Sequence, residues 1–361
     1  MTTDSSPAPD TPPSALRYAL DRLAGGKDLD ELAVEAAVAE MVSGSAPAAQ
    51  VGQLLLALRA KGETAAEIAG AVRALRGAML RVAYSRPDVL VDTCGTGGGA
   101  VTTINLSTAA AFVAAGAGAV IAKHGNRSYT SRSGSADVLE ALGIDLDLDA
   151  ERAVQVLEAV GAVFLFAPTY HPALRHVAPI RRELKVATLM NLVGPLSNPA
   201  GARRQVVGVG DPARAPAVAG ALARLGAVHA LVVHAEVGMD EFSPVGTTAI
   251  WEVEGGHVRE WQFDPGKSGL ATTSLEGLNG GEPHENAAAI VNLLESPGNA
   301  AAALHAAVVL NAGAAIYVGG LTATLESAIE LAVDSLESGR ARDKLEALRS
   351  HAGKRAGMKL P

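Results

Sequence analysis

The stretch that decides the fold is Asp92-Thr93-Cys94-Gly95-Thr96-Gly97-Gly98-Gly99. The apolar run at 89–91 predicts a buried strand before it, and the small, apolar run at 109–116 predicts a buried helix after it, which Asn105 or Ser107 can cap. Glycine at four of the five positions 95–99 lets the backbone take positive φ and expose N–H groups. Such groups at the positive end of a helix dipole bind anions, most often phosphate. The alternative, a mobile glycine loop at a sheet edge, is disfavoured by the strand and helix on either side.

The glycine loop fits neither of the two common phosphate-binding patterns. It lacks the Gly-Lys-Ser/Thr ending of a nucleotide-binding P-loop, and no third spaced glycine opens the helix, as a dinucleotide site requires. We therefore expect a third kind of phosphorylated ligand.

Composition narrows the classes of protein to which the chain can belong. Its 361 residues suffice for two domains, and with 48% hydrophobic but 3% aromatic residues the core must consist of Ala, Val and Leu. The net charge of −8 argues against a nucleic-acid partner. The apolar-or-glycine run at 109–122 is shorter than the roughly 20 residues that span a bilayer, so no membrane partner is expected. Cys94 is the single cysteine, which excludes an internal disulfide and favours a reducing, cytoplasmic compartment.

Apolar periodicity divides the chain into two domains after a short tail. Residues 1–13, rich in Pro and Ser, predict a disordered tail. Apolar residues at helical spacing predict four short helices in an all-helical domain at 14–84, which helices near 171–187 are expected to join. Residues 85–361 are expected to form a larger α/β domain, with a mostly parallel central sheet covered on both faces. Its expected strands are 89–91, 119–122, 162–166, 205–209, 230–233 and 249–253.

Basic and hydroxyl side chains follow the second expected strand. Lys123, His124 and Arg127 stand at its carboxyl end, before the hydroxyl-rich run at 128–137. In sheets of this kind ligands bind beyond the carboxyl ends of the strands, and ammonium, guanidinium and hydroxyl groups together bind phosphate. A polar surface turn is the alternative interpretation.

Two adjacent carboxylates, Asp240 and Glu241, follow the strand expected at 230–233. Such a pair at the carboxyl end of a strand can bind Mg²⁺ through oxygen, with a phosphorylated substrate supplying the remaining ligands. Solvated loop residues are the alternative. Because the pair follows a strand of the same sheet as the two motifs above, we favour the metal site.

Two prolines open a fourth motif. Pro172 and Pro179 suit the first turns of two short helices. Arg181 then stands in a first turn, where a cation is unfavourable unless an anion is present. Arg181 can hold a carboxylate in bidentate fashion, and an ion pair with Glu183 or Glu158 is equally compatible with the sequence.

With these motifs in view, the chain resembles the anthranilate phosphoribosyltransferase family of tryptophan biosynthesis, from about residue 14 to at least residue 320. The matching segments lie at 95–98, 105–110, 123–128, 133–137, 166–168, 171–173, 181–184, 191–196, 240–241 and 285–289. The resemblance implies transfer of the 5-phosphoribosyl group from 5-phosphoribosyl diphosphate to the amine of anthranilate, with release of pyrophosphate. It also implies a fold of the nucleoside phosphorylase and phosphoribosyltransferase type, Mg²⁺ as cofactor, and a homodimer formed through the helical domain.

The resemblance also assigns residues to ligands. As ligands of the phosphoribosyl diphosphate it implies Gly95, Gly98, Thr103, Asn105, Ser107, Thr108, Lys123 and Ser135. Around anthranilate it implies Gly95, His124, Asn126, His171, Arg181 and Pro195, with Arg181 facing the carboxylate. Catalytic roles fall to Lys123, Asn126 and Arg181, and Mg²⁺ to Ser107, Asp240 and Glu241.

Two other functions remain open on the sequence. A pyrimidine-nucleoside-phosphorylase-like enzyme shares the layout and the phosphate chemistry but needs no Asp-Glu metal pair, so Mg²⁺ dependence separates the two. A non-catalytic relative that binds nucleic acid or regulates is disfavoured by the acidic net charge and by Lys123, Asp240 and Glu241. Gly99 favours that relative, because the family's glycine loop normally ends in Asp.

Gly99 also generates a prediction. An Asp at this position places a carboxylate beside the pyrophosphate and restricts the backbone, so Gly99→Asp should lower the KM for 5-phosphoribosyl diphosphate. Steady-state kinetics at saturating anthranilate, with the wild type as reference, measure this. An unchanged or higher KM contradicts the expectation.

Overall fold

Four helices form the N-terminal bundle of the computed structural model, which describes residues 14–128 and 132–353. They are α1 (Ala15–Ala24), α2 (Glu31–Ser43), α3 (Ala48–Lys61) and α4 (Ala65–Gly77). The side chains of Ser14, Asp30 and Thr64 accept backbone N–H groups in the first turns of α1, α2 and α4, as N-cap residues do. The four predicted helices are thus confirmed, whereas the tail predicted at 1–13 lies outside the described residues.

The remainder of the described chain is built on a seven-stranded sheet of order β3-β2-β1-β4-β5-β6-β7. Five strands run parallel: β1 (Leu90–Gly95), β2 (Val120–Gly125), β3 (Ala162–Phe166), β4 (Arg204–Gly208) and β5 (His229–Ala235). Two antiparallel strands follow, β6 (Thr248–Glu254) and β7 (His257–Phe263). The mostly parallel sheet is confirmed. The sequence does not predict β7, because most of its side chains are exposed and polar.

The carboxyl end of β2 extends further than its apolar run predicts. Lys123, His124 and Gly125 belong to the strand, because each pairs with a residue of β3. These side chains are therefore held on a hydrogen-bonded strand end, not on a loop beyond it. A paired backbone fixes their directions more tightly than a loop does.

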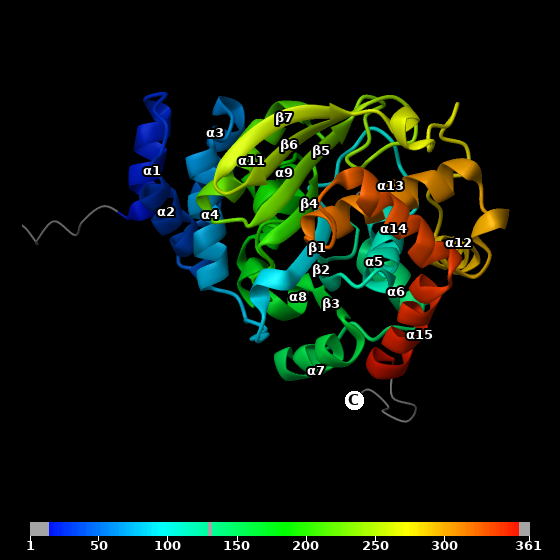
Figure 1. Ribbon diagram of the computed structural model, residues 1–361. Helices are drawn as coiled ribbons and strands as arrows, with labels where there is room; N and C mark the ends of the chain where they lie inside the picture. Colours follow the sequence, from blue (N-terminus) through cyan, green and yellow to red (C-terminus); the bar gives the residue numbers. More distant parts are fainter. Residues whose placement is uncertain (1–13, 129–131, 354–361) are drawn as a thin grey trace, which may run out of the picture.

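Helices cover both faces of the sheet, and each face has its own core (Figure 1). One core joins the sheet to α5 (Leu106–Gly116), α6 (Ser135–Ala141), α7 (Ala150–Val160), α12 (Pro283–Glu295), α13 (Ala302–Val318), α14 (Leu325–Glu337) and α15 (Arg340–Ala352). The other core joins it to α10 (Leu189–Val193), α11 (Ala215–Arg224) and the four bundle helices. The bundle therefore shares a core with one face of the sheet.

Short segments complete the described chain: η1 (Pro87–Val89), α8 (Ala167–Tyr170), η2 (Pro172–His176), α9 (Ala178–Leu184), η3 (Pro212–Arg214), η4 (Pro265–Ser268) and η5 (Pro297–Asn299). Of these, η2 contacts α2, and α9 contacts α3. The segment that follows β3 thus packs against the bundle. The division of the chain at residue 84 stays a prediction.

Polar contacts also fasten the bundle to the sheet. Arg214 lies 2.6 Å from Glu63, whose side chain is 1% exposed. Arg76 on α4 donates two hydrogen bonds, of 3.1 and 2.6 Å, to the carbonyl of Leu196. Hydrogen bonds to a guanidinium are stronger than those between neutral groups, so Arg76 holds the chain after α10 firmly against α4.

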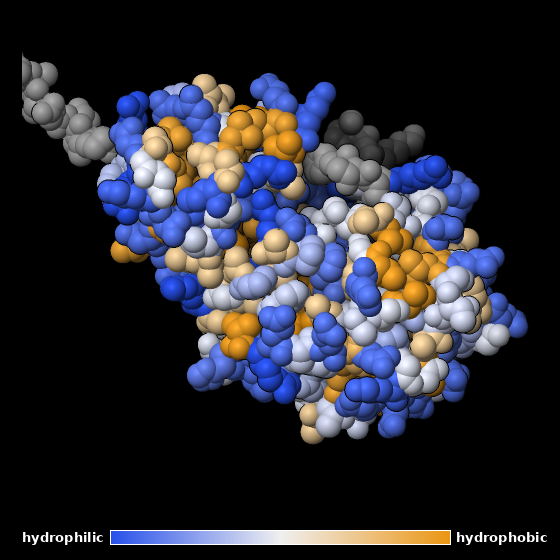
Figure 2. All heavy atoms as spheres, turned by 90° about the horizontal axis from the view of Figure 1, so that it is seen from above, coloured by the Kyte–Doolittle hydropathy of each residue, from blue (hydrophilic) through white to orange (hydrophobic). Residues whose placement is uncertain are grey.

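The surface is mixed in character. Figure 2 shows apolar patches separated by hydrophilic side chains. Tyr18, Leu32 and Leu56 are exposed large apolar residues on α1, α2 and α3. Among the described residues, no helix has both the length and the apolar character that crossing a membrane requires.

A buried carboxylate joins β6 to its neighbours at the sheet edge opposite the carboxyl ends of the parallel strands. Glu252 accepts hydrogen bonds from His229 (2.9 Å), Arg259 (2.6 Å), Trp261 (2.9 Å) and Tyr317 (2.9 Å). Burial raises the pKa of Glu252, but the hydrogen bonds outweigh burial and lower the pKa to about 2.

This shift predicts a pH dependence of stability. Because the ordinary pKa of Glu252 is 4.5 and its folded-state pKa is about 2, the carboxylate stabilises the fold above pH 4.5 and loses this effect as the pH falls toward 2. Urea denaturation of the wild type and of Glu252→Gln should therefore give free energies of unfolding that differ most above about pH 5 and converge below it. A difference that stays constant down to about pH 3 would contradict this.

Candidate active site

The two central strands part before they reach the carboxyl edge of the sheet. The last backbone pair between β1 and β2 is Val91↔Ile121, whereas β1 stays paired with β4, and β2 with β3, to the ends of these strands. Buried backbone N–H and C=O groups need hydrogen-bond partners. Beyond Val91, side chains must therefore supply the partners that the facing strand does not.

Asp92 and Asn198 supply two of these partners, and both are fully buried. Asp92 accepts the backbone N–H of His124 at 3.0 Å and the side-chain amide of Asn198 at 2.8 Å. The Asn198 amide also donates to the carbonyl of Ala122 at 2.7 Å. Burial raises the pKa of Asp92, although Lys123 and these hydrogen bonds lower it. The two side chains thus replace the missing backbone pairs on the β2 edge.

Lys123 bridges the same gap one residue earlier on β2. Its ammonium group is buried and donates to the Thr93 carbonyl on β1 and, at 3.1 Å, to the Ser107 hydroxyl in the first turn of α5. Burial lowers the pKa of Lys123, and Asp92 opposes this effect. A single cation therefore connects β2, β1 and the start of α5.

The glycine loop after β1 lies against Asp240. Gly97 and Gly98 have φ of 69° and 83°, as the glycine-rich stretch predicts. A Cβ atom built on Gly95 or on Gly99 would lie 2.9 Å from a carboxylate oxygen of Asp240. Glycine at these two positions lets the loop approach the carboxylate. The loops after β1 and β5 are therefore in direct contact.

Glu241 reaches the start of α5. Its carboxylate accepts the Ser107 N–H at 3.0 Å and the Thr103 hydroxyl at 3.2 Å. Burial and the neighbouring Asp240 raise the pKa of Glu241 to about 8. Burial raises the pKa of Asp240 too. Lys123 lowers the pKa of Glu241, but by less than burial and Asp240 raise it.

This donor set suits a hard divalent cation. Asp240, Glu241 and the Ser107 hydroxyl provide oxygen ligands, which Mg²⁺ prefers. Two neighbouring, half-buried carboxylates repel each other and are stabilised by a cation between them. The residues predicted for Mg²⁺ are therefore ones that fit it.

Two buried histidines stand on the other side of the gap. The rings of His124 on β2 and His171 after α8 lie 5.0 Å apart between centroids. Among the described residues, His124 Nε2 and both ring nitrogens of His171 have no hydrogen-bond partner. Burial lowers the pKa of His124 to about 3, with help from His171, and the pKa of His171 to about 4. Both rings are therefore neutral at physiological pH.

The loop 194–198 lies over these histidines. The backbone of Gly194 partly offsets the lowered pKa of His124, and the backbone of Ser197 does the same for His171, so the loop is next to both rings. Pro195, predicted to line the anthranilate side, is buried in this loop. Its carbonyl accepts the Gln205 amide at 2.9 Å.

Three predicted residues lie near the start of α6, namely Asn105, Asn126 and Ser135. The Ser135 hydroxyl donates to the Asn126 carbonyl at 3.4 Å, and it lies close above Gly125, where a Cβ would collide with it. Asn105 stands at the N-cap position of α5, but its side chain does not cap the helix. It donates to the Ser133 carbonyl at 3.2 Å and so ties the glycine loop to α6.

Arg181 and Thr108 differ from the other predicted residues. Arg181 is the fourth residue of the seven-residue α9, in its last turn, so the argument from an unfavourable first-turn cation is wrong. It is half-buried on a helix that contacts α3 and η2. The Thr108 hydroxyl is buried without a partner among the described residues, and its predicted contact with the diphosphate stays a prediction. Of the hydroxyl-rich run, residues 129–131 lie outside the described part.

Sequence reasoning missed several residues that hold the site. Asp92, Asn198 and Gln205 are polar side chains buried at the gap, and Asn286 on α12 donates to Asn105 at 3.0 Å. For Asp92 a signal existed, because a carboxylate directly after the apolar pair 90–91 in a buried strand must have a compensating partner. For Asn198 no local pattern identified the strand it would reach.

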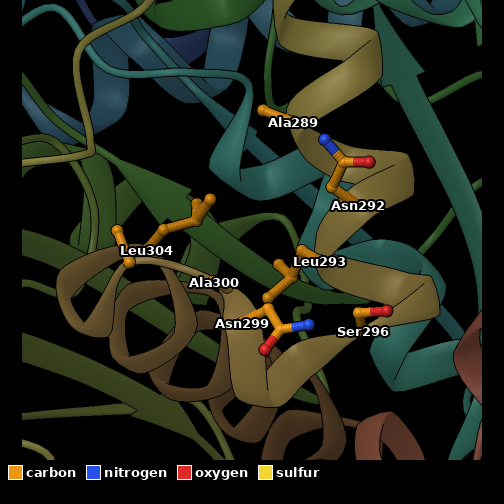
Figure 3. Close-up of a pocket in the computed structure, with 8 residues that line it drawn as sticks. Ala289, Asn292, Leu293, Ser296, Asn299, Ala300 and Leu304 are labelled. Atoms are coloured by element: carbon orange, nitrogen blue, oxygen red, sulfur yellow. The ribbon is translucent and has the colours of Figure 1, made fainter.

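A hollow of about 420 Å³ lies elsewhere on the molecule, apart from the strand ends and loops described above. It lies between α12, η5 and the start of α13, and Figure 3 shows Asn292, Ser296 and Leu304 around it. None of the residues predicted for the site lines it. The charged and polar side chains predicted for the site therefore lie at the strand ends and not around this hollow.

Comparison with known families places two models on the chain. Residues 87–342 match the model described as "Glycosyl transferase family, a/b domain", and residues 17–79 match "Glycosyl transferase family, helical bundle domain". The first match covers the observed α/β part of the chain, and the second covers the four-helix bundle.

Individual proteins are similar over nearly the whole length. The anthranilate phosphoribosyltransferase of Rubrobacter xylanophilus is 50% identical over 92% of this chain and 96% of its own length, and that of Symbiobacterium thermophilum is 46% identical over 92% and 97%. The crystal structure of the Thermus thermophilus enzyme superposes with a TM-score of 0.86 at 43% identity, covering 92% of this chain and 99% of that one. The Saccharomyces cerevisiae enzyme in complex with PRPP and Mg superposes with a TM-score of 0.83 at 26% identity, covering 93% and 97%.

Proposed function

The chain belongs to the anthranilate phosphoribosyltransferase family, and from this premise we propose how its residues divide the reaction between them. The protein transfers the 5-phosphoribosyl group of 5-phosphoribosyl diphosphate to the amine of anthranilate and releases pyrophosphate, a step of tryptophan biosynthesis. One observation carries the division of roles. Lys123, Ser107 and Glu241, from three separate segments, are linked by hydrogen bonds at the carboxyl edge of the sheet.

The diphosphate side is proposed to be the glycine loop with the start of α5. We propose that the glycine loop at 95–98 and the positive end of α5 attract an anion, to which the hydroxyls of Thr103 and Ser107 can donate. Lys123 is within 3.1 Å of Ser107 and supplies a positive charge there. Asn105, and Ser135 at the start of α6, would hold the ribose end. Because the Thr108 hydroxyl is buried, we assign that residue at most a backbone contact.

We propose Mg²⁺ as the cofactor, held by Asp240, Glu241 and Ser107. The Saccharomyces cerevisiae relative has been crystallised with PRPP and Mg. When bound, the ion neutralises the diphosphate and so makes pyrophosphate a better leaving group. The two carboxylates would hold the ion close to the glycine loop, because that loop lies against Asp240.

The acceptor side is proposed to lie between β2 and the segment after β3. His124, His171 and Pro195 would contact the anthranilate ring, and Asn126 and Gly95 would lie on either side of it. Lowered pKa values keep both histidines neutral, so they do not compete electrostatically with Arg181 for the substrate carboxylate. Arg181 is the proposed partner of that carboxylate, as the guanidinium geometry suits.

The chemistry needs charge stabilisation more than proton transfer. Cleavage of the C1–O bond leads through a transition state that resembles an oxocarbenium ion, as in glycoside cleavage. Negative charge develops on pyrophosphate, where Lys123 and the loop N–H groups can stabilise it. The amine of anthranilate is uncharged at neutral pH and needs no strong base. Holding the two substrates together at one site supplies much of the rate acceleration through proximity. We propose Lys123, Asn126 and Arg181 as the catalytic residues.

We further propose a homodimer formed through the bundle, acting in the cytoplasm. Tyr18, Leu32 and Leu56 are 46%, 76% and 44% exposed on α1 to α3, which supports an interface there. The single thiol of Cys94 supports a reducing compartment.

The function is tested with purified protein. Anthranilate fluorescence should fall on incubation with 5-phosphoribosyl diphosphate and Mg²⁺, and EDTA should abolish the change. Glu241→Gln, which keeps the size of the side chain, should raise the Mg²⁺ concentration for half-maximal activity by roughly tenfold or more, since it removes one charged ligand. Activity on anthranilate without any divalent cation, or phosphorolysis of a pyrimidine nucleoside instead, would overturn the assignment.

Arg181 gives a second test, specific for the acceptor. Arg181→Ala should raise the KM for anthranilate by roughly ten- to a hundredfold, the effect of losing a charged hydrogen bond, and change the KM for 5-phosphoribosyl diphosphate far less. Arg182→Ala, one residue further on the same helix, is the matched control, because Arg182 is exposed. Equal effects of Arg181→Ala on both KM values would refute the role.

A further inference from the structure

The parting of β1 and β2 makes the acceptor side dependent on two side chains that touch no substrate. We propose that Asp92 and Asn198 are positioning residues that set the width and shape of the anthranilate pocket. This inference rests on the acceptor side proposed above. It concerns residues that no motif and no comparison assigned.

Asp92 determines where the end of β2 lies. Past the last backbone pair at Val91↔Ile121, β1 is joined to the β2 backbone by the Asp92 carboxylate, 3.0 Å from the His124 N–H. The position of the His124 ring thus depends on the length and orientation of one short side chain on the neighbouring strand. If the backbone pairing continued, β2 would stay at the normal strand spacing from β1 and the two strands would not separate here.

Asn198 connects the same carboxylate to the opposite wall of the pocket. It donates to Asp92 at 2.8 Å and to the Ala122 carbonyl at 2.7 Å, and its oxygen accepts the Ala200 N–H at 2.9 Å. Asn198 ends the loop 194–198, whose backbone lies beside His124 and His171. The Asp92–Asn198 hydrogen bond therefore couples both walls, the strand with His124 and the loop with Pro195.

The pair satisfies the buried His124 N–H and the Ala122 carbonyl, and in doing so it also fixes where these groups lie. An apolar pair of similar volume would leave both backbone groups without a partner. What an apolar pair cannot do is accept one N–H from β2 and one amide from the loop at fixed angles. The pair is therefore best explained by the geometry that it imposes.

Three variants separate positioning from stability. Asp92→Asn turns an amide toward the amide of Asn198, and Asn198→Asp turns a carboxylate toward that of Asp92, so each single variant breaks the hydrogen bond. The double variant with both substitutions restores the bond between the two side chains with the donor and acceptor exchanged, but it leaves the Ala122 carbonyl without its donor. Thermal unfolding, kcat and both KM values are measured for all three, and anthranilate binding is measured directly by its fluorescence.

We expect each single variant to raise the KM for anthranilate by about tenfold, the effect of one broken buried hydrogen bond, with the KM for 5-phosphoribosyl diphosphate within about twofold of wild type. The double variant regains only the bond between the two side chains, so its KM for anthranilate should lie between the wild-type value and those of the single variants. Lower melting temperatures with both KM values unchanged would overturn the inference. So would a double variant whose melting temperature rises above those of the single variants while its KM for anthranilate does not fall.

If a single variant fails to fold, Arg76 supplies an independent measurement. Its side chain holds the Leu196 carbonyl from the bundle, on the same loop, and touches neither histidine in the contacts described. Arg76→Met should raise the KM for anthranilate selectively, and an unchanged value would overturn the inference. Failure of the proposed function is distinguishable, because then the wild type itself would not consume anthranilate.

Discussion

The site depends on one constraint, namely that β1 and β2 separate while each remains paired on its other side. Their last shared pair is Val91↔Ile121. The groups exposed by the separation are bound by Asp92, Asn198 and Lys123, so the sheet opens without leaving its central edges unsatisfied. The opening places a buried cation and two neutral histidines at the carboxyl edge of the sheet, next to the loops that follow β1 and β5.

The glycines of the loop after β1 serve two purposes next to the place where β1 and β2 separate. In the loop after β1 glycine permits the positive φ of Gly97 and Gly98, and it also leaves room for a carboxylate from the loop after β5. This close approach concerns Gly99 directly. The side chain usual in the family would enter the space of Asp240, so the Asp240 side chain must move if an Asp is introduced there. The segment that we propose to bind the diphosphate therefore also limits where Asp240 and Glu241, the proposed metal ligands, can lie.

Much of this could be predicted from the sequence, and the failures have physical causes. Apolar periodicity identified the four bundle helices and six of the seven strands, because buried faces leave a regular pattern. It missed β7, which is largely exposed, and it ended β2 too early, because polar Lys123 and His124 are held in the strand by β3. It placed Arg181 in the wrong turn, because the length of a short helix is not fixed by its first proline. It missed Asn198, because only the folded chain brings that residue to Asp92, 106 positions away.

The central claim is that the loops after β1 and β5 and the end of β2 surround one sugar diphosphate. A crystal structure of the protein with 5-phosphoribosyl diphosphate and Mn²⁺, with anomalous diffraction recorded near the manganese edge, tests it most directly. The account predicts that the anomalous peak marks a Mn²⁺ ion bound by Asp240 and Glu241. It also predicts that the pyrophosphate lies between Lys123 and the glycine loop. A peak remote from both carboxylates, or the diphosphate bound in the hollow beside α12, would contradict it.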